Sequence, residues 1–345
     1  MKAVYIESHG GPDVLTYGNI TEPEPGPNDV KIRVRASALN RLDIYTRAGT
    51  RGLKRSFPPP LILGGDTAGD IVKCGENVDK FVPGDHVVIN PRVWCEKCDF
   101  CMAGKDDLCT TSTFMGTNFN GSYAEYVVIP AKNAHNIETD VDYKQAAATP
   151  TTFLPTWNLI VRKGQLKSSD TVLILSASSG VGSAAIQISK NVIGARIIAT
   201  TSTDDKAQKA LAIGADDVIV YPRESISKQV SDFTNGQGVD MVIDSTGAQF
   251  FPEAFQSLRI GGRYGICGVT TGYKGALHMG NLFTKNLTIF GAFMGSQSDM
   301  ISIVNALNKR TIQPVVEHSF ALHQAQDAHN LMESQNFFGK IVLVS

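Results

Sequence analysis

Four cysteines within fifteen residues are the side chains whose spacing most directly specifies a chemistry. Cys95, Cys98, Cys101 and Cys109 are separated by two, two and seven residues in the segment WCEKCDFCMAGKDDLC. Thiolates so closely spaced can surround one tetrahedral zinc ion, and a site with four protein ligands leaves no position for water or substrate. We therefore predict a structural zinc site. An iron–sulfur cluster is the competing reading, but the segment lacks the cysteine-proline ending typical of such runs.

A turn of small residues between an apolar run and a helix-like run is the second informative segment. Strand-like residues 171–177 precede the turn and the helix-like run AAIQISK follows it. The turn consists of Ser178, Ser179, Gly180, Val181 and Gly182. This order directs backbone N–H groups and the positive end of a helix at a pyrophosphate, although small residues would also allow close packing of the helix on the sheet.

The end of the next strand, residues 195–201, predicts the choice of dinucleotide. A site specific for NAD would place a carboxylate here to bind the ribose hydroxyls. This chain has Thr201 instead, and the nearby donors Ser202, Thr203 and Lys206 suit a 2'-phosphate. We therefore expect NADP(H) to be preferred, although Lys206 could equally be a solvated helix residue. Tyr221, at the end of the following strand, is expected near the same phosphate, and Arg223 is a weaker candidate.

Two different patterns of hydrophobic residues along the chain indicate two domains, which would position these segments. In the first 130 residues, short β-branched runs at 30–36, 68–75, 84–91 and 123–130 alternate with Gly, Pro, Asn and Asp, which predicts a β-rich domain. From about residue 170, strand-like runs alternate with helix-like runs, which is typical of βαβ units and a doubly wound parallel sheet. A helix at 299–309 and a terminal strand at 340–345 could complete the first domain.

Composition excludes several classes of protein. A formal net charge of −1 without a Lys/Arg-rich block gives no footprint for nucleic acid or an anionic membrane. No uncharged apolar run approaches the roughly 20 residues that span a bilayer, and the N-terminus lacks a signal-peptide core. We therefore expect a cytoplasmic protein with a small-molecule substrate. Cys74 and Cys267, which stand apart from the cluster, are expected to be buried core thiols.

The whole chain resembles the medium-chain dehydrogenase/reductase superfamily. The resemblance rests on GGDTAGDIVKCGENV, FVPGDHVV, the cysteine segment, GSYAEYVVIP, ASSGVG, GADDVIVY and FGKIVLVS. It implies an α/β protein in which a GroES-like β-rich catalytic domain is joined to a Rossmann nucleotide-binding domain. The catalytic domain would comprise 1–148 and 295–345, with the zinc lobe at about 92–112, and the Rossmann domain 149–294.

The sequence departs from the zinc-dependent alcohol dehydrogenases of this superfamily at the catalytic metal site. Asn40, Gly65, Asp66 and Thr152 stand where those enzymes have two cysteines, a histidine and a glutamate, and Tyr45 replaces the proton-relay histidine. Asparagine, glycine and threonine cannot replace two thiolates and an imidazole around zinc. The chain is therefore similar to the quinone oxidoreductases and the enoyl or acryloyl reductases, but with a structural zinc retained.

This resemblance implies a mechanism. NADPH would bind between the domains with its nicotinamide beside Asn40 and Thr156, and hydride would pass to an activated alkene or a quinone. Asn40 and Tyr45 are the expected donors to the developing negative charge, and Tyr45 could also deliver a proton or could merely pack in the wall. Asp43 completes this polar set and is expected to hydrogen-bond backbone. Arg51, Lys54 and Arg55 could bind an anionic group such as a coenzyme A phosphate or could be solvated.

Two other functions remain open. One is an alcohol or aldehyde dehydrogenase that works without catalytic zinc, and the other is a nucleotide-sensing or nucleic-acid-binding protein that has lost catalysis. The segment LFTKNLTIFGAFMG resembles the edge-strand region through which relatives pair their nucleotide domains. A homodimer, or a homotetramer built from dimers, is therefore expected.

Overall fold

The computed structural model describes residues 1–221, 223 and 225–345, and these divide into two compact units. Unit 1 comprises residues 1–151, 300–310 and 314–345, and unit 2 comprises residues 152–299 and 311–313. The boundaries expected from the sequence, at 148/149 and 294/295, lie close to these divisions. No helix among the described residues is both long and apolar enough to span a bilayer.

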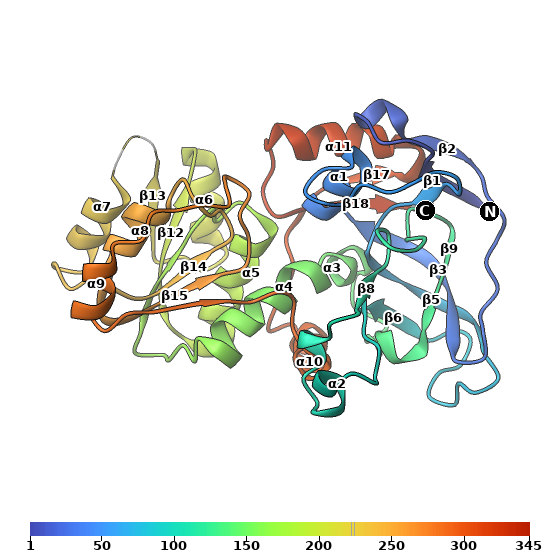
Figure 1. The fold of residues 1–345 in the computed structure, drawn as a ribbon, viewed down its shortest axis with the longest axis horizontal. Coiled ribbons are helices and arrows are strands. Elements are labelled where there is room, and N and C mark those ends of the chain that lie inside the picture. Colours follow the sequence, from blue (N-terminus) through green and yellow to red (C-terminus); the bar gives the residue numbers. More distant parts are fainter. Residues whose placement is uncertain (222, 224) are drawn as a thin grey trace. The chain divides into compact units, whose positions relative to one another are not determined.

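Unit 1 is built on a curved, mainly antiparallel sheet (Figure 1). In the described residues its strand order is β10-β6-β5-β3-β18-β17, with β9 also paired to β3, and a smaller sheet has the order β2-β1-β4. The strands are β1 (Lys2–Ile6), β2 (Thr16–Asn19), β3 (Asp29–Ala38), β4 (Leu61–Ile62), β5 (Asp66–Cys74), β6 (His86–Ile89), β7 (Arg92–Val93), β8 (Thr113–Phe114), β9 (Tyr126–Pro130), β10 (Ala134–Asn136), β17 (Val316–Ala321) and β18 (Lys340–Val344).

The described residues of unit 1 form helices as well as strands. The helices are α1 (Arg41–Ala48), α2 (Asp99–Met102), α3 (Tyr143–Ala147) and α11 (Ala325–Ser334). The terminal strand β18 pairs antiparallel with β3, from Val342 opposite Ala38 to Val344 opposite Ala36, so the end of the chain does complete the first unit. Strand β17 and helix α11 were not predicted from the sequence. A stripe of buried Ala325, Ala328 and Met332 on α11 packs into the core beside β1.

Unit 2 contains one parallel sheet with helices packed against it (Figure 1). Its six strands in the described residues follow the order β13-β12-β11-β14-β15-β16, which is the order of a Rossmann fold. They are β11 (Thr171–Ile174), β12 (Arg196–Thr201), β13 (Asp217–Val220), β14 (Val239–Asp244), β15 (Leu258–Ile266) and β16 (Thr288–Gly291). The helices are α5 (Gly180–Gln187), α6 (Asp204–Ala212), α7 (Ile226–Phe233), α8 (Phe251–Gln256) and α9 (Met279–Thr284), and α4 (Pro150–Trp157) and α10 (Gln297–Asn308) lie at the unit boundaries.

The helices of unit 2 form because capping and hydrophobic spacing agree. Helix α7 begins after Ser225, whose side chain accepts a hydrogen bond from the backbone of Lys228, and it buries Ile226 and Val230 one turn apart. These side chains join Leu173 of β11 and other strand residues in the core of the unit. The parallel sheet therefore holds the carboxyl ends of β11 and β12 side by side, which is where the sequence predicts dinucleotide binding.

Candidate active site

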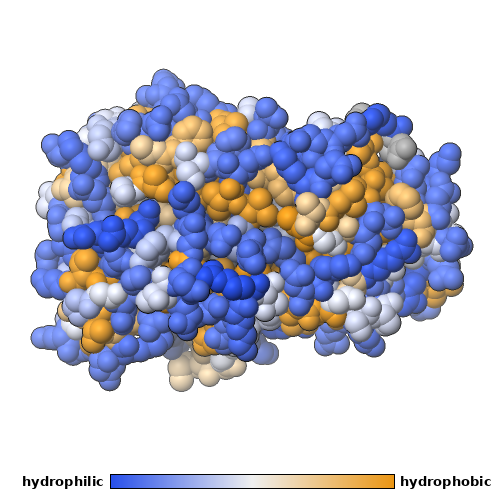
Figure 2. All heavy atoms as spheres, turned by 180° about the vertical axis from the view of Figure 1, so that it is seen from behind, coloured by the Kyte–Doolittle hydropathy of each residue, from blue (hydrophilic) through white to orange (hydrophobic). Residues whose placement is uncertain are grey.

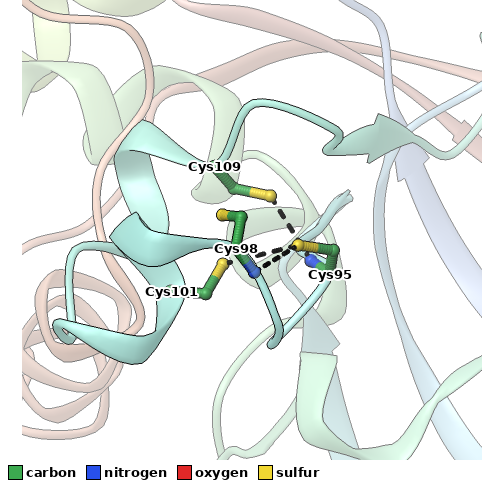
Figure 3. A group of neighbouring side chains, drawn as sticks. All are labelled: Cys95, Cys98, Cys101 and Cys109. Atoms are coloured by element: carbon green, nitrogen blue, oxygen red, sulfur yellow. Dashed lines mark hydrogen bonds between the residues drawn. The ribbon is translucent and has the colours of Figure 1, made fainter.

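The four cysteines of the predicted zinc site converge (Figure 3). Their sulfur atoms all lie within 4.8 Å of one another, and those of Cys95 and Cys101 are 3.9 Å apart. Zinc–sulfur bonds of about 2.3 Å in a tetrahedron place sulfur atoms about 3.8 Å apart, so the geometry fits a zinc ion. The backbone N–H groups of Cys98 and Cys95 point at the sulfurs of Cys95 and Cys109, each at 3.4 Å.

The thiols of this lobe differ in how readily they lose a proton. Hydrogen bonds, first from Thr111 and then from backbone N–H groups, lower the pKa of Cys95 to about 5. Burial instead raises the pKa of Cys101 to about 12, and a bound cation would favour its thiolate form. Among the described residues, these four form the one group of three or more His, Cys, Asp or Glu side chains placed to share a metal ion.

The predicted phosphate turn has the geometry of a dinucleotide-binding turn. Ser179 caps α5: its hydroxyl accepts from the backbone of Gly182 at 2.9 Å and donates to the carbonyl of Ser176 at 2.8 Å. A Cβ on Gly182 would lie 2.0 Å from the Ser176 oxygen, so only glycine permits this approach of helix to strand. Gly180 and Val181 form the first turn of α5, with Ser178 half-buried just before them. The turn therefore fits a pyrophosphate at the start of the helix.

The ribose end of the predicted dinucleotide site lacks a carboxylate at the end of β12. Thr201 is buried, and its hydroxyl has no hydrogen-bond partner among the residues that the structure describes. Ser202 is exposed, and Thr203 caps α6 by accepting from the backbone of Lys206 at 3.3 Å. The ring of Tyr221 packs edge-on against another aromatic ring. The buried hydroxyl of Thr201 and the N-terminus of α6 are therefore placed to contact a ribose that bears a phosphate.

The cationic candidates at this end are already engaged. Arg223 forms an ion pair with Asp204 at 2.5 Å, and Lys206 is not without an interaction partner either. The charge available to a 2'-phosphate is therefore smaller than the sequence suggests. The remaining cofactor candidate, Thr156, is buried in α4 and donates its hydroxyl to the carbonyl of Thr152 at 2.6 Å, so only its methyl group is available for packing.

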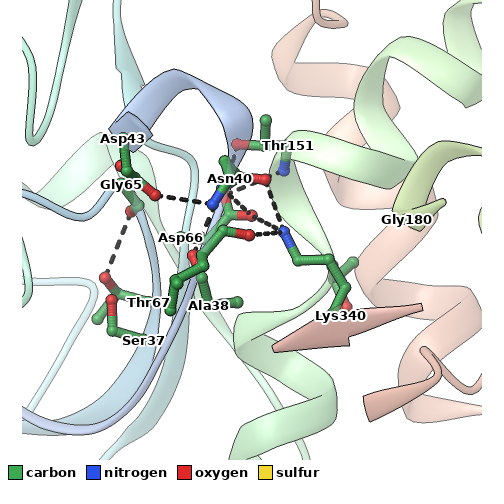
Figure 4. A network of polar contacts seen from close by, with 12 residues as sticks. Ser37, Ala38, Asn40, Asp43, Gly65, Asp66, Thr67, Thr151, Gly180 and Lys340 are labelled. Atoms are coloured by element: carbon green, nitrogen blue, oxygen red, sulfur yellow. Dashed lines mark hydrogen bonds and ion pairs between the residues drawn. The ribbon is translucent and has the colours of Figure 1, made fainter. Parts of the chain in front are cut away.

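In unit 1, the position of the missing catalytic zinc ligands is occupied by a cluster of hydrogen-bonded side chains (Figure 4). The ammonium group of Lys340 donates to the Asn40 Oδ1 atom at 2.6 Å and to the carbonyl of Leu39 at 2.6 Å. It also lies 3.5 Å from Asp66. Asn40 Nδ2 donates to Asp66 at 2.9 Å and, weakly, to the carbonyl of Ala38 at 3.4 Å.

Asp66 anchors this cluster. Its second carboxylate oxygen accepts from the backbone and the hydroxyl of Thr151, at 3.0 and 2.6 Å. Burial lowers the pKa of Lys340, and the charge of Asp66 opposes that shift. The expectation that Asn40 donates to substrate therefore needs revision, because acceptors within the chain face both hydrogens of its amide. Asn40 instead bridges a buried cation and a carboxylate.

A second chain of buried polar groups fixes the start of α1. Asp43 accepts from the backbone of Asn40 at 2.7 Å and from the hydroxyl of Tyr123 at 3.3 Å. The Tyr123 oxygen lies 3.3 Å from His329 Nε2, and Arg47 donates to His329 Nδ1 at 3.0 Å. Because Arg47 is a donor only, His329 carries its proton on Nε2 and donates to Tyr123. Each hydrogen bond in this network therefore runs from a donor to an acceptor that is one step closer to Asp43.

Burial of this hydrogen-bond network shifts the pKa values of Asp43 and His329 in opposite directions. Burial, reinforced by the nearby Asp66, raises the pKa of Asp43 to about 7. Burial and the charge of Arg47 lower the pKa of His329 to about 3. Arg47 is in turn held by an ion pair with Glu333. Asp43 thus hydrogen-bonds backbone as the sequence predicts, within a network whose other members were missed.

Tyr45 stands apart from both clusters. It is half-buried on α1, and the guanidinium of Arg51 lies over its ring, 4.2 Å from the ring centre. The phenol remains the candidate for proton donation, with a positive charge beside it.

Sequence reasoning missed Lys340, Tyr123, His329 and Arg47. Two signals were available in the sequence. Lys340 is a charged residue that opens the apolar terminal strand IVLV, and His329 falls on the apolar face of a helical stretch. A charged or polar residue on a buried face needs a partner, but the sequence alone does not reveal which one.

The chain is similar to known oxidoreductases over its whole length. Residues 26–139 match the alcohol dehydrogenase GroES-like domain, and residues 180–309 match the zinc-binding dehydrogenase family. A crystal structure of an NAD-dependent alcohol dehydrogenase superimposes with a TM-score of 0.95 at 40% identity, covering all of both chains.

Curated relatives are more distant and differ in activity. An NAD-dependent alcohol dehydrogenase of Saccharolobus solfataricus is 29% identical, and an acryloyl-coenzyme A reductase of Metallosphaera sedula is 26% identical, each over all of both chains. A quinone oxidoreductase of Pseudomonas aeruginosa is 27% identical over 99% of both chains.

Proposed function

The chain belongs to the zinc-binding medium-chain dehydrogenase/reductase superfamily, and on that premise we propose that it reduces an activated alkene or a quinone with NADPH, without a catalytic zinc ion. Its resemblance to this superfamily and its combination of a GroES-like domain with a Rossmann domain are confirmed. The chain is therefore an oxidoreductase. The identity of its acceptor and the choice of NADPH over NADH are the proposal.

The cluster of Asn40, Lys340 and Asp66 carries this proposal. It supplies an amide oxygen, an ammonium group and one carboxylate where metal-dependent relatives have thiolate and imidazole ligands. The amide oxygen already accepts a hydrogen bond from the ammonium group. The positive charge of that group repels a metal cation. These side chains therefore do not provide a site for a zinc ion that would polarise an alcohol or aldehyde oxygen. Activated alkenes and quinones need no such metal, since the charge that follows hydride addition is spread over a conjugated system.

The side chains at the carboxyl end of the parallel sheet would hold the cofactor. The turn from Ser178 to Gly182 would bind the pyrophosphate, and Thr201, Thr203 and Tyr221 would surround the adenine ribose. When bound, NADPH supplies the hydride. The absence of a carboxylate at Thr201 supports NADPH, whereas the engagement of Arg223 by Asp204 limits that preference.

Tyr45 would act on the oxygen that gains negative charge. Its phenol can donate a hydrogen bond, and then a proton, to the enolate or hydroquinone oxygen. The Arg51 guanidinium over its ring adds a positive charge where the negative charge develops. Asp43, Tyr123 and His329 serve this step indirectly, since they hold the first turn of α1 in place.

Alcohol oxidation with NAD is the second candidate function. It is favoured by the 40% identity to an NAD-dependent alcohol dehydrogenase. Without metal, Tyr45 would have to remove the alcohol proton itself, which is harder than donating a proton to an enolate.

Steady-state kinetics with a matched substrate panel tests the proposal. The purified protein is assayed for NADPH and NADH oxidation with 2-cyclohexen-1-one, a benzoquinone, acryloyl-CoA and propanal, and for NAD reduction with propan-1-ol. We expect NADPH-preferring reduction of the enone, the quinone or the thioester, and at least tenfold less activity with Tyr45→Phe. Turnover confined to propanal and propan-1-ol would favour the second candidate function.

We also propose that two chains pair through unit 2. Strand β16 is the edge of the described parallel sheet, and Met279, Phe283 and Phe293, which flank it in the sequence, are 65%, 73% and 65% exposed. Figure 2 shows one face of the molecule, where hydrophobic groups reach the surface among hydrophilic ones. Sedimentation velocity should give a dimer or tetramer, and Phe283→Asp should shift it toward the monomer. A monomeric wild-type protein would refute the pairing.

A further inference from the structure

The fourth cysteine of the zinc lobe lies far along the chain from the other three. Cys95, Cys98 and Cys101 fall within seven residues, and the backbone N–H of Cys98 points at the Cys95 sulfur at 3.4 Å. Cys109 follows after seven intervening residues, beyond an exposed turn at Gly104, where φ is 69° and an added Cβ would meet no atom within 4 Å. A ligand reached through such a turn needs contacts outside its own segment to fix its position.

The side chain of Arg92 makes such contacts. Arg92 lies on β7 and is buried, and its guanidinium donates to the carbonyls of Asp107 and Cys109 at 2.7 and 3.3 Å. Its Nε atom donates to the hydroxyl of Ser112 at 3.0 Å, and that hydroxyl donates in turn to the Cys109 carbonyl at 3.4 Å. One side chain therefore holds the backbone before, at and after the fourth ligand.

The backbone of Arg92 is itself fixed to the main sheet of unit 1. Asn133 lies fully buried in the turn between β9 and β10, and its amide nitrogen donates to the carbonyls of Asn90 and Arg92 at 2.8 Å each. The N–H of Asn90 donates back to the Asn133 carbonyl at 2.8 Å, and the N–H of Arg92 donates to the Asn90 side chain at 3.1 Å. The position of this backbone is therefore transmitted to Cys109 through a planar guanidinium that bonds several acceptors at once.

The charge of Arg92 supports a bound metal as well. A divalent zinc ion with four thiolate ligands leaves the lobe with excess negative charge. Buried charge is costly unless a nearby group of opposite sign compensates it. The guanidinium contacts the backbone of a ligand residue and is buried, so solvent screens its charge less than that of an exposed lysine.

We propose that Arg92 is a positioning residue for the zinc ion. It holds Cys109 where the sulfur completes the ligand tetrahedron, through its fork of hydrogen bonds and not through charge alone. Lysine at this position keeps the charge but loses the planar fork that reaches two carbonyls and a hydroxyl together. The inference concerns the zinc lobe and does not depend on which substrate the protein reduces.

Competition with a chromophoric chelator measures the zinc affinity of the purified full-length protein. Arg92→Met should bind zinc at least about tenfold more weakly than wild type, the usual cost of losing an outer contact to a metal ligand. Arg92→Lys should recover only a minor part of this loss. Ser112→Ala removes a single half-buried acceptor and should weaken binding by about twofold to fivefold.

The matched control is Arg47→Met. Arg47 is an equally buried arginine of unit 1, but its ion pair with Glu333 lies outside the lobe. Arg47→Met should lower the stability of unit 1 in urea and change the zinc affinity by less than about twofold.

Four results would overturn the proposal. Unchanged zinc affinity in Arg92→Met, or an equal loss in Arg47→Met, would mean that Arg92 serves the fold alone. Full affinity in Arg92→Lys would assign its effect to charge, and a wild-type protein without zinc would leave Arg92 no metal to position. If neither Arg92 variant folds, Ser112→Ala decides the matter, since wild-type affinity in that variant would contradict the proposed hydrogen-bond fork.

Discussion

Two buried groups in unit 1 should make opposite contributions to the pH dependence of stability. The pKa of His329 is lowered to about 3 in the folded state, so its contribution is present above its ordinary pKa of 6.5 and is lost as the pH falls. The pKa of Asp43 is raised to about 7, so its contribution is present at low pH and is lost as the pH rises through 7. Between pH 7.5 and 5.5 the two effects partly cancel in the wild-type protein.

Single substitutions separate these effects. One pKa unit corresponds to about 1.4 kcal/mol, so acidification from pH 7.5 to 5.5 should stabilise His329→Gln relative to wild type by about 1 kcal/mol. The same change should destabilise Asp43→Asn relative to wild type by about 2 kcal/mol. Each substitution also lowers the free energy of unfolding by an amount that does not depend on pH. This loss does not affect the slope of the free energy of unfolding against pH. Replacement of the exposed His323 by glutamine is the control for the loss of an imidazole outside this network.

Urea unfolding of unit 1 measures these slopes. Trp94 lies in unit 1 and Trp157 in unit 2, so fluorescence in a Trp157→Phe background reports on unit 1. Comparison of variants at the same pH removes the common effect of acid on the zinc lobe. Parallel pH dependences for wild type and both variants would refute the assigned titrations and the hydrogen-bond order from Arg47 to Asp43.

Three further predictions concern the metal, the buried cation and the phosphate turn. Cys109→Ser should abolish zinc binding measured by mass spectrometry and lower stability, whereas Cys267→Ser should retain one zinc ion per chain. Lys340→Met should lower the free energy of unfolding by about 3–5 kcal/mol in urea titrations, because it leaves a buried carboxylate unpaired; a loss below about 1 kcal/mol would contradict the assigned ion pair. Gly182→Ala should abolish NADPH binding in fluorescence titrations, because its Cβ would lie 2.0 Å from a backbone oxygen, whereas Gly291→Ala, whose Cβ meets no atom closer than 3.8 Å, should bind normally.

The sequence predicted the parallel sheet well because its strands are continuous apolar runs separated by amphipathic helices. Residues 171–177 and 195–201 became β11 and β12, and the turn between them took the expected geometry. The cysteine lobe was equally predictable, since its four ligands are close in sequence. Residues 316–334 were missed because β17 alternates polar and apolar residues irregularly, and the hydrophobic face of α11 is interrupted by His329.

The polar clusters could not be predicted, because they join residues far apart in the chain. Lys340 reaches Asn40 across 300 positions, and His329 reaches Tyr123 across 206. Each partner lies in a strand or helix whose own pattern of polar and apolar residues does not reveal the contact. Local patterns report burial, whereas the pairing of buried polar groups depends on which strands and helices adjoin in the folded unit.

Zinc content and alkene reduction, measured on the same chelator-treated preparation, test the absence of a catalytic zinc most directly. We expect one zinc ion per chain and NADPH-dependent reduction of acryloyl-CoA or 2-cyclohexen-1-one that survives chelation while the structural ion remains bound. Two zinc ions per chain, or activity that is lost with a second, labile ion and returns on its addition, would contradict the roles assigned here to Asn40, Asp66 and Lys340.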